Sequence, residues 1–186
     1  ADQLLNGIRA LHRADVIHGD LKPDNIMVDT EGLVRIVDFG SCHCRGMEQH
    51  TASIPLGTRH YSAPELVEGE APSEQSDLFS TAVIIHEMLT GALPWQGRYE
   101  KAVHRPLPPL QGHNAFIPLW INNVLQLALQ RQPKLRFTDA AEFRDALRRP
   151  VRSNKPVADS NIRQLRMWKG AVVVLAVLLL ISVTLR

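Results

Sequence analysis

The sequence predicts a mainly α-helical lobe with one small β-hairpin, followed by a single C-terminal transmembrane helix. Three observations predict this fold class. Apolar residues recur at helical spacing through much of residues 1–149, two short β-prone runs flank a turn near residue 31, and an uncharged apolar run fills residues 170–185. Of the 186 residues, 45% are hydrophobic, which suffices for a core, and 22% are charged, as is ordinary for a soluble domain.

The first elements are a helix and a hairpin. One face of the predicted helix carries Leu4, Leu5, Ile8 and Leu11. Residues 26–29 and 33–37 are β-prone, and residues 30–32 between them favour a turn. A hairpin brings its two ends together, so Asn25 before the first strand and Asp38 after the second should converge on one point. Magnesium accepts a few protein oxygens together with phosphate oxygens, so such a pair suits it.

The remaining elements of residues 1–149 are predicted helices. Residues 78–89 are apolar nearly all round, as expected of a buried central helix, and Gly91 with Pro94 beyond predicts its end. A later helix should bury one face, made of Trp120, Val124, Leu127 and Ala128. Its opposite face should be polar, made of Asn122, Asn123 and Gln126. Thr138 is expected to cap the last helix.

The residue pattern with the most chemical content is His18-Gly19-Asp20-Leu21-Lys22-Pro23-Asp24-Asn25, followed by Asp38-Phe39-Gly40. Phosphoryl transfer from ATP to a hydroxyl needs a group that takes the hydroxyl proton, a cation on the moving phosphate and oxygen ligands for magnesium. Three further segments follow in order: 57–65, which ends in Ala-Pro-Glu, then 76–80, then 134–138.

In this order and spacing, these segments resemble the eukaryotic-type (Hanks-type) protein kinase family, over roughly residues 1–149. The resemblance implies the C-terminal lobe of a protein kinase that uses ATP and Mg²⁺. It implies that Asp20 is the catalytic base, that Lys22 meets the γ-phosphate, and that Asn25 and Asp38 bind the metal.

The same resemblance implies supporting roles for the other motif residues. Thr58 would bond Asp20 and Lys22, and Asp77 would brace the catalytic loop. Glu65 would anchor the activation segment by pairing with Arg136, in the bidentate geometry that suits an Arg–carboxylate pair. The resemblance gives the other motif residues, His18, Phe39 and Gly40, structural roles.

Lys22 narrows the substrate, because a lysine two residues after the catalytic aspartate is the pattern of serine/threonine kinases. We therefore expect transfer of the γ-phosphate of Mg-ATP to Ser and Thr hydroxyls of proteins. Two alternatives stay open. Small-molecule phosphotransferases of the aminoglycoside and choline kinase type share the His-Gly-Asp start, but they usually lack the lysine, the Phe-Gly after the metal aspartate and the Ala-Pro-Glu segment. A membrane-tethered pseudokinase would serve as a scaffold without chemistry.

The sequence departs from the family in two ways. Gly19 stands where many kinases have an arginine that pairs with a phosphate on the activation segment, so activity should not depend on loop phosphorylation by that route. Thr51, Ser53 and Ser62 are expected to be ordinary loop hydroxyls rather than autophosphorylation sites. No Gly-x-Gly and no strand lysine precede the catalytic loop. We therefore expect a fragment without the N-terminal lobe, poorly active by itself.

The C-terminal part predicts a membrane anchor. Residues 170–186 are almost wholly apolar, and the preceding linker, 150–169, is rich in Lys and Arg. The basic flank places the kinase lobe on the cytoplasmic side, and its low aromatic content argues against nucleic acid as a partner. The anchor, together with residues 37–41, weakly resembles bacterial tail-anchored kinases fused behind a metal-dependent protein phosphatase.

Two cysteines follow the Asp-Phe-Gly segment. Cys42 and Cys44 flank His43, with His50 nearby, so metal binding and redox sensing are alternatives to consider. Cys-x-Cys alone is not the spacing of a zinc site, and no second pair is present. We expect two reduced thiols in a loop.

Overall fold

A computed structural model describes residues 1–44, 60–97, 107–113 and 115–148. The chain divides into two units, Ala1–Val151 and Arg152–Arg186, and the second lies outside the described residues. The first unit contains the α-helices α1 (Asp2–Arg13), α2 (Pro64–Val67), α3 (Glu74–Thr90), α5 (Leu119–Ala128) and α6 (Ala140–Arg148). Its strands are β1 (Val16–Ile17), β2 (Ile26–Val28), β3 (Val34–Ile36) and β4 (His43–Cys44). Short 3₁₀ turns are η1 (Pro23–Asn25), η3 (Pro94–Gly97), η4 (Leu110–Gly112) and η5 (Pro133–Leu135). The predicted combination of helices with a small antiparallel hairpin is confirmed.

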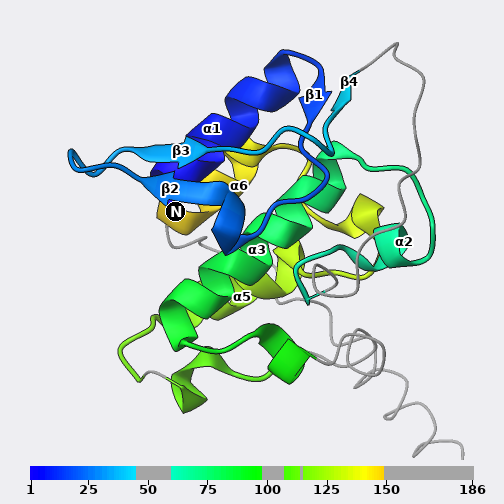
Figure 1. Cartoon of the computed structure of the whole chain (residues 1–186). Helices are drawn as coiled ribbons and strands as arrows, with labels where there is room; N and C mark the ends of the chain where they lie inside the picture. The colour runs from blue at the N-terminus through cyan, green and yellow to red at the C-terminus, as the bar shows by residue number, and fades with distance from the viewer. Residues whose placement is uncertain (45–59, 98–106, 114, 149–186) are drawn as a thin grey trace, which may run out of the picture. The chain divides into compact units, whose positions relative to one another are not determined.

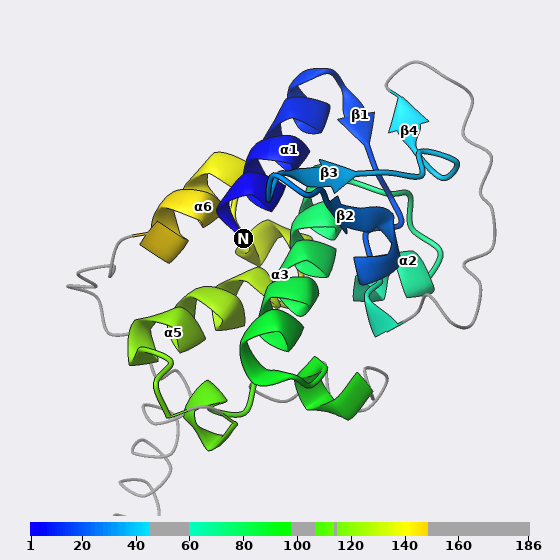
Figure 2. The same ribbon diagram turned by 60° about the vertical axis from the view of Figure 1, so that its left-hand side comes forward.

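The centre of the first unit is α3, which α1 and α5 contact from different sides (Figures 1 and 2). Every residue from 76 to 86 is buried, as its apolar sequence predicts. Ser73 caps its start by accepting the Ser76 N–H, and the Ser76 hydroxyl in turn accepts the Ser73 N–H. Gly91 ends it in the left-handed region, at φ 70°. The position of α3 matters because its Asp77 accepts two backbone N–H groups of the loop that follows β1.

The predicted hairpin is formed by β2 and β3, which pair antiparallel with Ile26 opposite Ile36. Asp29 shapes its turn, because one carboxylate oxygen accepts the N–H groups of Glu31 and Leu33. These bonds, that of Leu33 foremost, hold the pKa of Asp29 below its usual range. The hairpin packs on α1, where it covers one side of the helix (Figure 1).

A second two-stranded pair was not predicted. In it, β1 and β4 run antiparallel, with Val16 opposite Cys44 and Ile17 opposite His43. Strands of two residues are too short to show an alternating pattern in a sequence, so only the tertiary contact reveals them. This pair joins the chain just before the catalytic loop to the chain just after the Asp-Phe-Gly segment.

Two predictions about helices were wrong. In α5, Asn122 is buried at 7% exposure, whereas Leu127 is 41% exposed. Asn122 is buried because its side-chain oxygen accepts the N–H of Leu110, which satisfies the polar group inside the protein. At the start of α6, Asp139 rather than Thr138 supplies the cap, since its carboxylate accepts the N–H groups of Ala141 and Glu142.

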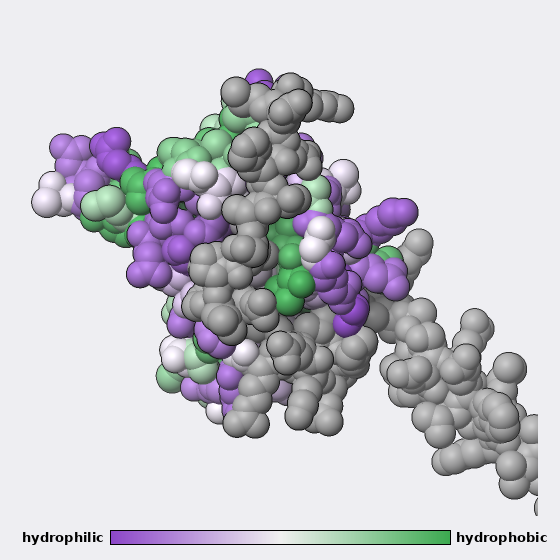
Figure 3. Space-filling model, turned by 45° about the vertical axis from the view of Figure 1, so that its right-hand side comes forward, coloured by the Kyte–Doolittle hydropathy of each residue, from purple (hydrophilic) through white to green (hydrophobic). Residues whose placement is uncertain are grey.

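On the face shown in Figure 3, hydrophilic side chains cover most of the described surface and hydrophobic ones are confined to smaller areas. No helix within the described ranges is long and apolar enough to cross a membrane. The predicted anchor, 170–186, and the basic linker, 150–169, lie outside those ranges.

Candidate active site

The catalytic loop begins directly after β1 and is held by one carboxylate of α3. Asp77 is 1% exposed, and its two oxygens accept two consecutive loop amides. Its Oδ2 accepts the N–H of His18 at 2.9 Å, and its Oδ1 accepts the N–H of Gly19 at 3.0 Å. Hydrogen bonds to an ionised acceptor are stronger than those between neutral groups. The buried central helix therefore fixes the backbone immediately before Asp20.

His12, a residue that the sequence reasoning missed, supports the same carboxylate. Its Nε2 lies 2.9 Å from Asp77 Oδ2, and its Nδ1 lies 3.8 Å from Glu74 at the start of α3. His12 follows Ile8 by four residues, which places it on the buried face of α1. That position was the available signal, because a polar residue in a predicted apolar face needs a buried partner.

His18 connects the catalytic loop to the segment that ends at Asp38. Its Nδ1 accepts the N–H of Asp20 at 3.4 Å, so its Nε2 carries the proton and donates to the carbonyl of Val37 at 3.1 Å. Its ring also lies against Phe39, with centroids 5.5 Å apart. His18 is fully buried, and its contacts couple the position of Asp20 to that of the Asp-Phe-Gly segment.

Asp20 and Lys22 form a close ion pair. Lys22 Nζ lies 2.7 Å from Asp20 Oδ2. The other oxygen, Oδ1, is buried and has no hydrogen-bond partner among the residues that the structure describes. Asn25 donates its side-chain N–H to the Asp20 carbonyl at 2.9 Å, so its side-chain oxygen remains the free acceptor of that amide. The loop thus presents one carboxylate oxygen, one ammonium and one amide oxygen.

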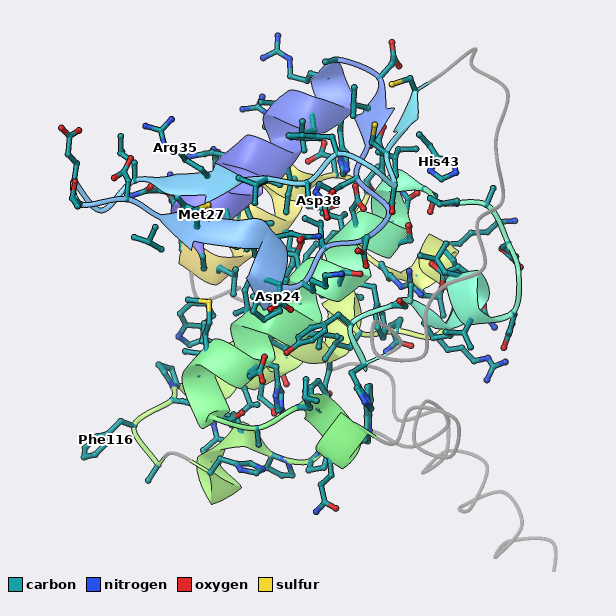
Figure 4. All side chains as sticks on the ribbon, viewed as in Figure 1. Asp24, Met27, Arg35, Asp38, His43 and Phe116 are labelled. Atoms are coloured by element: carbon teal, nitrogen blue, oxygen red, sulfur yellow. The ribbon has the colours of Figure 1, made fainter. Side chains whose placement is uncertain are left out.

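Asn25 and Asp38 lie at the same end of the hairpin, as the sequence pattern predicts. The N–H of Val37 donates to the carbonyl of Asn25 at 2.9 Å, which brings the entry to β2 beside the exit from β3. Asp38 is exposed, and Figure 4 shows it where the chain leaves β3. Its backbone is in the left-handed region, at φ 62°, and its Oδ1 accepts the N–H of Gly40 at 3.2 Å. An unfavourable backbone angle of this kind clusters at functional sites.

The oxygens of Asn25 and Asp38 suit magnesium, which takes hard oxygen donors. No group of three His, Cys, Asp or Glu side chains in the described part of the chain could hold a metal ion. A two-ligand site of this type needs further oxygens from the phosphates of a nucleotide, and this is how magnesium is usually held in phosphoryl-transfer sites. The donor set therefore fits a metal that arrives with its nucleotide.

Glu65 and Arg136 form a buried bidentate ion pair. Arg136 Nη1 lies 2.6 Å from Glu65 Oε1, and Nη2 lies 2.7 Å from Oε2. The guanidinium also lies over the ring of Phe79 in α3, 4.8 Å from its centroid. Its remaining N–H groups donate to the carbonyls of Gln75, Gln130 and Arg131. All its donors thus have partners, and α2 is tied to α3 and to the segment before α6.

Tyr61 makes a contact that the sequence reasoning also missed. Its hydroxyl donates to Glu87 Oε2 of α3 at 2.7 Å. Burial, followed by this bond and the charge of Glu87, raises the pKa of Tyr61 well above its usual value. Its neighbour Ser62 is buried at 7% exposure, which does not suit a phosphorylation site. Thr51, Ser53 and Thr58 lie outside the described residues.

Comparison with known proteins agrees with the motifs. Residues 1–150 match the family described as Protein kinase domain. The chain is 30% identical over 151 residues to the serine/threonine-protein kinase PrkC of Bacillus subtilis, covering 76% of this chain and 23% of the relative. It is 33% identical over 154 residues to the serine/threonine-protein kinase PknB of Mycobacterium leprae, covering 78% of this chain and 24% of the relative.

A probable serine/threonine-protein kinase of Clostridium perfringens is 30% identical over 149 residues, covering 76% of this chain and 22% of the relative. The chain therefore spans about a quarter of the length of the curated relatives that it matches.

Proposed function

This chain belongs to the protein kinase family, and from that premise we propose that it is the C-terminal catalytic lobe of a serine/threonine protein kinase. The reaction is transfer of the γ-phosphate of Mg-ATP to Ser and Thr hydroxyls of protein substrates. The observation that carries the proposal is how the two oxygens of the Asp20 carboxylate are bonded. Lys22 holds one of its oxygens at 2.7 Å, while the other is buried without a partner among the described residues.

That arrangement suits a general base. The unpartnered Oδ1 of Asp20 accepts the proton of the attacking hydroxyl as the new O–P bond forms. Lys22, which is already next to the base, stabilises the negative charge of the transferred phosphoryl group. Little covalent chemistry falls to the protein, so the rate depends on positioning, and Asp77 and His18 supply that by fixing the loop.

Asn25 would hold magnesium through its side-chain oxygen, and Asp38 would do so through its carboxylate, of which Oδ1 also accepts the N–H of Gly40. The metal, when bound, neutralises the phosphate charge. Thr58 is proposed to bond Asp20 and Lys22, which would place the activation segment beside the base.

We also propose that residues 170–186 anchor the protein in a membrane, with the catalytic lobe on the cytoplasmic side. The apolar run and its basic flank support this.

Phosphate transfer from radiolabelled Mg-ATP tests the enzymatic proposal. The protein, together with any coding sequence that precedes residue 1, is expressed and compared with Asp20→Asn and Asp38→Asn. Glu31→Gln, which changes an exposed acid in the hairpin turn, is the matched control. Both site variants should lose transfer to Ser and Thr by at least about a hundredfold, while the control retains it.

The competing functions predict other results. Transfer only to a small alcohol such as choline or an aminoglycoside would indicate a small-molecule phosphotransferase. Absence of transfer together with absence of magnesium-dependent nucleotide binding would indicate a pseudokinase scaffold.

The anchor is tested separately by membrane fractionation of the protein with and without residues 170–186. If deletion left the protein in the membrane pellet, the anchor assignment would be wrong.

A further inference from the structure

Cys42 and Cys44 are the two cysteines of the chain, and both are partly exposed free thiols. Cys42 ends the turn after the Asp-Phe-Gly segment and directly precedes β4, and Cys44 lies in β4 two residues further on. One residue separates the two thiols along the chain, so a change in the backbone of residues 42–44 can bring them together. Proximity and access to solvent are what two thiols need in order to react with one another.

The backbone on either side of these thiols joins two parts of the active site. The N–H of Cys42 donates to the carbonyl of Phe39 at 3.1 Å, which closes the turn after Asp38. Cys44 pairs with Val16 in β1, two residues before the catalytic loop. The dithiol therefore lies between the proposed metal ligand and the loop that carries the proposed base.

The contact with the catalytic loop leaves little spare space. A Cβ added to Gly19 would lie 3.0 Å from the carbonyl oxygen of Ser41 and 3.6 Å from His43 Nδ1. Any shift of residues 41–44 towards the loop would therefore press on Gly19, next to Asp20. This close packing makes the position of the loop sensitive to the conformation of β4.

We propose that Cys42 and Cys44 are a redox-sensitive dithiol that forms an intramolecular disulfide with small-molecule disulfides and thereby lowers phosphotransfer reversibly. One cysteine thiolate attacks the S–S bond of oxidised glutathione, which forms a mixed disulfide and releases one glutathione. The second thiolate attacks the protein sulfur of that mixed disulfide and releases the other. Two protein thiols are oxidised, one molecule of oxidised glutathione is reduced to two of glutathione, and the two protons pass to them.

Closing this bond should bend β4. A disulfide requires Cα atoms within about 4.4–6.8 Å of one another, whereas residues two apart in a fully extended chain are about 6.6 Å apart. A bridge from Cys42 to Cys44 constrains the backbone at the start of β4, so the pairing with Val16 and Ile17 should weaken and the packing against Gly19 should change. Burial raises the pKa of Cys42, and its thiolate is scarce at neutral pH, so oxidation through Cys42 should accelerate as the pH rises.

The first test uses the 186-residue chain and does not require activity. The chain is equilibrated with mixtures of reduced and oxidised glutathione, alkylated with iodoacetamide and weighed by mass spectrometry. Both alkylation sites should disappear together in a monomer that carries no glutathione. Cys42→Ser and Cys44→Ser should instead each retain a single thiol or a single glutathione. Independent glutathionylation of both cysteines, a disulfide-linked dimer, or full alkylation in oxidised glutathione alone would overturn the dithiol.

The second test rests on the proposed function and uses the protein together with any coding sequence that precedes residue 1. Oxidation should lower phosphate transfer at least tenfold, and dithiothreitol should restore it. The double variant Cys42→Ser/Cys44→Ser should be insensitive to the oxidant. A disulfide that forms without a change in transfer would overturn the switch but leave the kinase proposal intact. A reduced protein without transfer would instead contradict the kinase proposal, whatever the mass measurement shows.

Discussion

Arg136 binds Glu65 through both of its terminal nitrogens, at 2.6 and 2.7 Å, although 71 residues separate the two along the chain. The side chains are 0% and 5% exposed, so water cannot replace either partner. The pair ties α2 to α3, because Arg136 also donates to the carbonyl of Gln75 and lies over the ring of Phe79. Removal of one partner would leave the other charge buried and unpaired, which is far more costly than the loss of an exposed pair.

Arg136→Leu should therefore lower the free energy of unfolding by about 3–5 kcal/mol, measured by urea denaturation. Arg131→Leu is the matched control, because Arg131 pairs with Glu68 at the surface and that pair contributes at most about 1 kcal/mol. Equal losses in the two variants would show that the Glu65–Arg136 pair contributes no more than a surface contact.

Asp77→Asn should disturb the catalytic loop. The N–H groups of His18 and Gly19 donate to different oxygens of Asp77, and in asparagine an N–H₂ group would replace one of these acceptors and face a donor. We expect a loss of about 1–3 kcal/mol in stability and a fall on the order of a hundredfold in phosphate transfer. Asp145→Asn, which changes an exposed acid on α6, is the control and should leave transfer unchanged. An Asp77→Asn protein with normal transfer would contradict the positioning role.

Comparing Gly19→Ala with Gly32→Ala separates the cost of backbone strain from the cost of a steric clash. Both glycines have positive φ, 75° and 80°, so a Cβ at either costs about 1–2 kcal/mol in backbone strain. Only at Gly19 would the Cβ also meet a backbone oxygen, that of Ser41 at 3.0 Å, whereas Gly32 has open space. Thermal or urea unfolding should therefore show Gly19→Ala to be less stable than Gly32→Ala by at least about 1 kcal/mol. Equal stability would show that residues 41–43 can move away from the loop.

The hairpin and the ion pair of Glu65 could be predicted because each has a strong local signal. The hairpin has two β-prone runs and a turn, and the observed strands fall inside the predicted ones. Glu65 and Arg136 each lie in a motif of recognisable spacing, although their contact is distant in the sequence. The convergence of Asn25 and Asp38 followed from the hairpin alone, since antiparallel pairing brings its two ends together.

Other features had no such signal. The β1–β4 pair consists of two-residue strands that only the folded backbone aligns. Asn122 was predicted to be exposed because it is polar, yet the N–H of Leu110 gives it a buried partner. His12 was overlooked for a similar reason, since its buried partner, the carboxylate of Asp77, is distant in the sequence. Periodicity describes an element by itself, whereas each of these residues is defined by what packs against it.

His86 predicts how stability depends on pH in the acid range. It is 3% exposed in α3, and burial foremost lowers its pKa, with the nearby ring of His113 acting in the same direction. The unfolded chain takes up a proton near pH 6.5, whereas the folded protein does not until a lower pH. The contribution of neutral His86 to the free energy of unfolding is therefore fully present above about pH 6.5. It is lost as the pH falls towards the lowered pKa, by up to about 1.4 kcal/mol per pH unit.

The replacement His86→Asn isolates this effect from the other histidines. Its side-chain N–H can still donate to the carbonyl of Ala92, which His86 Nδ1 contacts at 2.9 Å, but it does not titrate. Urea denaturation at pH 7.5 and pH 5.5 should show that the wild-type protein loses more stability between the two than the variant does. A variant that lost as much as the wild type between the two pH values would assign the acid sensitivity to other groups, because residue 86 of the variant does not titrate.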